Sequence, residues 1–150
     1  MFDGFIADEH LFCLDLNEPF PEVGSDIDMV FDLAGLISKT ALSIATAIKQ
    51  SDVVLVPIYN EVKAIKAGLN TIAEVLELNK NVVVIATKLQ KRNKNDIFTN
   101  WSKCEDMQNI QNAVHSQISP NIPVLPLKYS SVFDTIFEQE KSISQLMQAS

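Results

Sequence analysis

An aspartate at the end of a short apolar run is the first feature of this chain that could do chemistry. Residues 28–35 read Asp-Met-Val-Phe-Asp-Leu-Ala-Gly, so Asp32 ends the run and Gly35 follows three residues later. At the carboxyl edge of a parallel sheet, such an aspartate can hold the water shell of a Mg²⁺ ion. A glycine can bring its backbone N–H close to a terminal phosphate because it has no Cβ. The alternative interpretation of these residues is a strand followed by a polar turn.

Histidine and cysteine give weaker patterns. His10 and His115 stand apart from each other and from Cys13 and Cys104 in the sequence, which disfavours a metal site or a Cys-His nucleophile. The two cysteines form no CxxC motif, so they are typical of reduced thiols in a protein without a disulfide framework. No catalytic residue is predicted.

The composition predicts one folded domain over residues 1–150. Of the 150 residues, 47% are hydrophobic and 21% are charged, which suits a chain that buries a core. The net charge of −7 disfavours broad binding to nucleic acid or anionic membranes. No apolar stretch reaches the roughly 18 residues of a membrane span, and no signal peptide is recognisable, so we expect a cytoplasmic protein without a membrane segment.

Strands and helices alternate from residue 27 onward. Apolar runs predict strands at 27–33, 53–57, 82–86 and 122–127, and helical spacing predicts helices that end near Gln50, cover 61–78, contain Met107 to Ile118, and begin at Ser130 or Ser131. This order predicts an α/β fold with three layers, α/β/α, around a mostly parallel sheet. Continuous β-branched runs favour strands that are buried on both faces. Two prolines in 122–127 place that strand near a sheet edge.

Residues 1–25 are poorly assigned, apart from a possible strand over 11–16 that prolines interrupt. In the helix over 61–78, with Asn60 as its N-cap, one face should pack on the sheet and the other should face solvent. The expected inner face consists of Val62, Ile65, Leu69 and Ile72, and the expected outer face of Lys63, Lys66, Asn70 and Glu74.

Ligands of parallel α/β sheets bind beyond the carboxyl ends of the strands. The residues expected there are Asp32, Gly35, Pro57, Thr87 and Lys88. Tyr59 and Tyr129 also follow strands, where a ring could stack on a base or pack against neighbouring helices. Residues 88–103 interleave five basic side chains with Phe98 and Trp101, which suits a surface loop better than a nucleic-acid site.

The order of these motifs resembles the second half of the ParA/MinD family, the deviant Walker ATPases of plasmid partition, chromosome segregation and septum placement. The resemblance covers 27–147 and rests on residues 28–35, on 51–58 with its proline near the end, and on 63–69, Lys-Ala-Ile-Lys-Ala-Gly-Leu. It implies a fold like that of P-loop NTPases. It also implies that Asp32 is the Walker B aspartate, which binds Mg²⁺ through water, and that Gly35 contacts the γ-phosphate. Pro57, Thr87 and Lys88 would complete a vestigial nucleotide site.

The family's glycine-rich phosphate loop has no counterpart in this sequence. The four glycines are Gly4, Gly24, Gly35 and Gly68, and none is followed by Lys-Thr or Lys-Ser. The phosphates of a nucleotide would therefore lack most of their ligands. The first expectation is a pseudo-ATPase, a non-catalytic scaffold or partner-binding module with no cofactor. The alternative is a fragment of an active partition ATPase that binds Mg-ATP through a loop encoded upstream.

A protein partner or self-association is expected, with nucleic acid reached only through a partner or through the basic stretch 88–103. Without the strand that feeds the phosphate loop, the strand at 27–33 would present an open apolar edge, which promotes association. We expect residues 11–16 to pair with it, within one chain or across a dimer.

Overall fold

The structure, a computed structural model, describes residues 13, 18, 28–33, 42–90 and 100–129. The chain divides into two compact units, one of Met1–Cys13 with Tyr129–Ser150 and the other of Leu14–Lys128. All the helices and strands of the described residues belong to the second unit. The single domain expected over 1–150 stays a prediction, and the elements expected at 11–16 and from residue 130 onward lie outside the described residues.

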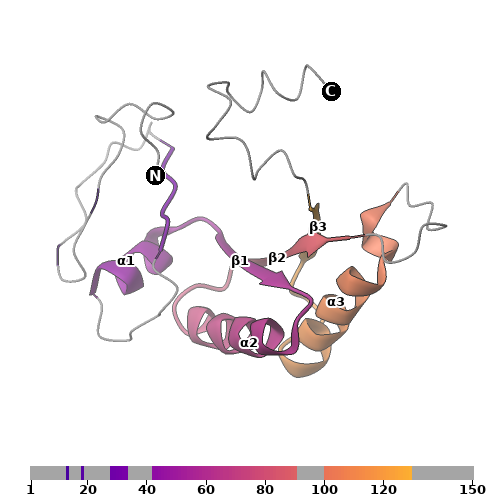
Figure 1. Ribbon diagram of the computed structural model, residues 1–150. Helices are drawn as coiled ribbons and strands as arrows, with labels where there is room; N and C mark the ends of the chain where they lie inside the picture. Colours follow the sequence, from indigo (N-terminus) through magenta and orange to yellow (C-terminus); the bar gives the residue numbers. More distant parts are fainter. Residues whose placement is uncertain (1–12, 14–17, 19–27, 34–41, 91–99, 130–150) are drawn as a thin grey trace, which may run out of the picture. The chain divides into compact units, whose positions relative to one another are not determined.

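Helices and strands alternate along the described chain (Figure 1). In order, they are α1 (Leu42–Gln50), β1 (Val54–Tyr59), α2 (Val62–Leu76), β2 (Val82–Leu89), the short 3₁₀ helix η2 (Trp101–Lys103), α3 (Glu105–Gln117) and β3 (Val124–Lys128). The strands form one sheet in the order β1-β2-β3, and both pairings are parallel. The α/β class with a parallel sheet is therefore confirmed.

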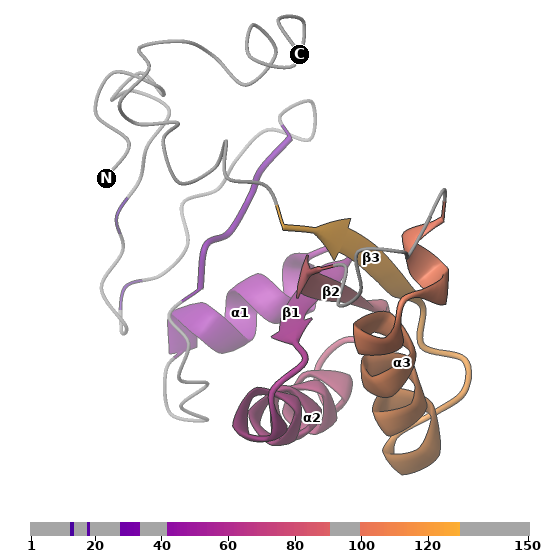
Figure 2. The ribbon, with the colours of Figure 1, turned by 45° about the vertical axis from the view of Figure 1, so that its right-hand side comes forward.

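Both crossover helices pack on the same face of the sheet. In two views, α2 and α3 lie on one side of the three strands (Figures 1 and 2). Val56 and Ile58 of β1 are buried on this face, together with Val84 of β2, which is in register with Val56. Ile72 of α2 and Ile110 of α3 belong to the same hydrophobic core and are fully buried. Apolar residues at helical spacing thus meet apolar residues at strand spacing.

The opposite face of the sheet is only partly covered. Leu55 is 59% exposed and Leu125 is 51% exposed, and both are in register with half-buried residues of β2, Val83 and Ile85. The described residues leave this face partly exposed, so the expectation that the apolar strands are buried on both faces stays a prediction. The run of β-branched residues correctly indicates strands but does not by itself show which faces are covered.

The backbone nitrogens of Pro57 in β1 and Pro126 in β3 point away from the central strand β2. The backbone N–H of Val54 donates to the carbonyl of Asn81 (2.8 Å), and that of Val84 donates to the carbonyl of Pro123 (2.9 Å). Because successive residues of a strand direct their N–H groups to opposite sides, Pro57 and Pro126 fall where a donor to β2 is not needed. The expected edge position of the last strand is confirmed for the described sheet.

The segment before α1 differs from the expectation. Residues 28–33 form neither helix nor strand, and Val30 is 97% exposed, so the strand expected over 27–33 is wrong for these residues. A strand requires a neighbour for its ladder of hydrogen bonds, and the described sheet consists of β1, β2 and β3. Leu33 nevertheless packs against the hydrophobic core.

The side chain of Asn79 links the connections that follow α1 and α2. Nδ2 of Asn79 donates to the carbonyls of Ile48 (2.8 Å) and Ser51 (2.7 Å), which joins the end of α1 to the end of α2. Oδ1 of Asn79 accepts a hydrogen bond from the backbone N–H of Asn81 (2.8 Å).

No helix in the described part of the chain is both long enough and apolar enough to cross a membrane.

Candidate functional site: the carboxyl edge of the sheet

The strands deliver three of the five expected site residues to one edge of the sheet. Pro57 lies near the end of β1, and Thr87 and Lys88 lie near the end of β2. The parallel register pairs Tyr59 with Thr87, so the two strand ends are neighbours. Oγ1 of Thr87 donates to the carbonyl of Ile58 over 3.4 Å, which ties the two ends together.

The other two expected residues are not brought to this edge by a strand. Asp32 is exposed in a stretch without helix or strand, and Gly35 lies outside the described residues. The expected roles of Asp32 in binding Mg²⁺ and of Gly35 in contacting a phosphate stay predictions. Among the residues that the structure describes, no three His, Cys, Asp or Glu side chains gather as ligands for a metal ion.

Lys88 has an unusual backbone at the end of β2. Its φ is +54°, and among the described residues it is the only one other than glycine with a positive φ. Ala86 pairs with Pro126 and Leu89 pairs with Lys128. Two residues of β2 therefore lie between these pairs opposite one residue of β3, which is a β-bulge. A bulge of this kind re-aims a side chain. The left-handed backbone costs a residue with a Cβ roughly 1–2 kcal/mol.

The re-aimed side chain of Lys88 lies over an aromatic ring. Its Nζ is 4.7 Å from the centroid of the Tyr59 ring, a cation–π contact that is worth about 0.5–1 kcal/mol at an exposed site. Hydrogen bonding to Glu61, then the negative charge of Glu61 and then desolvation raise the pKa of Tyr59. Lys88 and Glu61 therefore both act on Tyr59, the first through its ring and the second through its pKa.

A second pair of polar side chains joins the end of β1 to α3. Nδ2 of Asn60 donates to Oδ1 of Asp106 over 2.6 Å. The expected role of Asn60 as N-cap is wrong, because α2 begins one residue later, with Glu61 as its N-cap and no side-chain cap. Asn60 instead bonds to the buried Asp106 in the first turn of α3, a residue that no sequence pattern selected. An acidic residue in a first helical turn was the available signal.

The basic stretch that suggested a nucleic-acid site is only partly described. Residues 91–99, which carry three of its basic side chains and Phe98, lie outside the described residues. Trp101 is half-buried in η2 and packs against the hydrophobic core, as expected for a ring that anchors a loop. Lys103 is exposed. A nucleic-acid interface over 88–103 stays a prediction.

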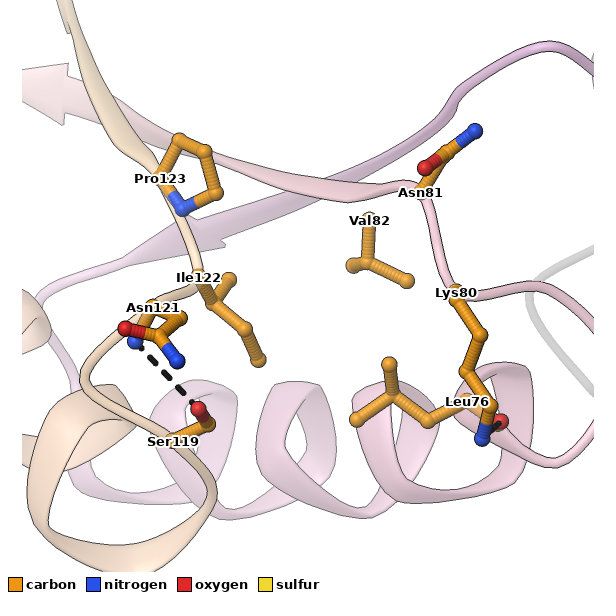
Figure 3. A pocket seen from close by; sticks show the side chains of 8 residues that line it. All are labelled: Leu76, Lys80, Asn81, Val82, Ser119, Asn121, Ile122 and Pro123. Atoms are coloured by element: carbon orange, nitrogen blue, oxygen red, sulfur yellow. Dashed lines mark hydrogen bonds between the residues drawn. The ribbon is translucent and has the colours of Figure 1, made fainter.

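A hollow of about 340 Å³ lies at the opposite edge, beside the amino ends of β2 and β3 (Figure 3). The side chains of Leu76, Val82 and Ile122 point toward its centre. Its polar groups are engaged locally, since Nζ of Lys80 donates to the carbonyl of Leu76 (2.5 Å) and the backbone N–H of Asn121 donates to Oγ of Ser119 (3.2 Å). No sequence motif indicated this hollow, because apolar residues there follow the ordinary core pattern.

Comparison with known proteins does not assign the chain to a family. No family model matches it, and no curated protein or solved structure matches it either.

Proposed function

We propose that this chain is a ParA/MinD-like partition or positioning module that acts without ATP chemistry, as a cytoplasmic scaffold that binds a protein partner or a second copy of itself. The proposal rests on the sequence resemblance of residues 28–35, 51–58 and 63–69 to that family, although residues 28–33 do not form the strand that this resemblance implies. The order strand, helix, strand, helix, strand from Val54 to Lys128, with all strands parallel, is compatible with such a module.

The observation that carries the non-catalytic part of the proposal is the pairing of side chains at the carboxyl edge. Lys88 contacts the ring of Tyr59, and Asn60 is hydrogen-bonded to Asp106. These polar groups engage one another at the edge where a nucleotide would bind. The sequence also lacks a Gly-Lys-Thr or Gly-Lys-Ser motif, so the residues at this edge would have to hold the phosphates without a backbone cradle.

Calorimetric titration of the 150-residue chain with MgATP tests the absence of ATP chemistry. We expect no saturable heat of binding up to millimolar nucleotide. A dissociation constant in the micromolar range would overturn the proposal and favour the alternative, a fragment of an active partition ATPase. Lys88→Ala serves as the matched variant, because loss of such binding in this variant would assign it to the carboxyl edge.

The scaffold part of the proposal is tested by measuring association with and without nucleotide. Light scattering on the eluate of a sizing column gives the mass of the chain over a range of protein concentrations. We expect the same masses in the presence and absence of MgATP. A mass that rises only when MgATP is added would contradict a scaffold that works without nucleotide, because in that case nucleotide controls the association.

A further inference from the structure

We draw no further inference here: the strongest candidate, the half-exposed apolar face of the three-stranded sheet around Leu55 and Leu125, carries nothing, because nothing in the structure shows what covers it.

Discussion

The side-chain amide of Asn60 donates a hydrogen bond to Oδ1 of Asp106 over 2.6 Å, between residues 46 positions apart in the chain. It joins the connection between β1 and α2 to the first turn of α3, where Asp106 is buried. A buried carboxylate that loses a hydrogen-bond donor is destabilised. The pair therefore fixes the amino ends of the two helices that cover the sheet.

Asn60→Ala should lower the free energy of unfolding by about 1–3 kcal/mol, because it leaves the buried Asp106 carboxylate without this donor. Urea unfolding measures the change. Asn70→Ala is the matched control, since Asn70 is exposed in the middle of α2 and its replacement should not destabilise the protein. Equal stability of the Asn60→Ala variant and the unchanged protein would show that the Asn60–Asp106 bond contributes nothing.

Gly68 lets α2 approach β1 closely. A Cβ built on Gly68 would overlap Cδ1 of Ile58 and lie 2.6 Å from its Cγ1, and Ile58 is fully buried. Gly68→Ala should therefore destabilise the protein by about 1–3 kcal/mol through overpacking, although alanine favours a helix by about 1 kcal/mol over glycine. Urea unfolding of the single variant measures the balance.

A double-mutant cycle with Ile58→Ala isolates the steric effect. Removing the Ile58 side chain leaves space for the new methyl group, so Gly68→Ala should cost less in that background, or stabilise the protein. If Gly68→Ala has the same effect in both backgrounds, the contact with Ile58 does not determine its cost. The glycine would then be tolerated on α2 for another reason.

The inner face of α2 is tested by comparing two of its apolar residues. Leu69 is buried in the core, whereas Val62 is 83% exposed, although the sequence predicts that both face the sheet. Leu69→Ala should cost about 2–5 kcal/mol, and Val62→Ala should change stability by no more than about 0.5 kcal/mol. The midpoints of urea unfolding compare them. Similar effects of the two substitutions would contradict the burial pattern.

The sequence predicts the described elements well where apolar spacing is regular. Ile65, Leu69 and Ile72 recur at helical spacing and pack on the core in α2, and the apolar run that begins at Val82 forms β2. The prediction that Val62 faces the sheet is wrong, because Val62 is the first residue of α2 and its side chain is exposed. Apolar spacing predicts a face, but the position at which the helix starts decides which residues of that face are covered.

The sequence does not predict the details that shape the carboxyl edge. The bulge at Lys88 depends on the offset between β2 and β3, which is a relation between two strands and not a property of either. The Asn60–Asp106 bond joins residues far apart in the sequence. Residues 28–33 have the composition of a strand but not the structure of one, because pairing also needs a neighbour. Local patterns carry no information about these long-range relations.

The last prediction concerns the titration of Tyr59. Hydrogen bonding to Glu61 and the negative charge of that residue favour the neutral phenol, so the pKa of Tyr59 lies above the ordinary value of 10.0. The contribution of this contact to stability is therefore fully present below pH 10 and is lost as the pH rises through the pKa of the folded state. Glu61→Ala removes both main causes and should bring the pKa of Tyr59 down toward 10.0.

The titration is followed by the ¹³C chemical shift of the tyrosine ring carbon that bears the hydroxyl group. Tyr59→Phe assigns the signal, because the chain has two tyrosines. Glu61 makes no side-chain cap to α2, so its replacement should leave the helix intact. Glu74→Ala, in the later part of α2, is the control and should leave the titration of Tyr59 unchanged. If Glu61→Ala also leaves the titration unchanged, then Glu61 does not raise the pKa of Tyr59. The contact between Lys88 and the Tyr59 ring would then involve no acidic residue.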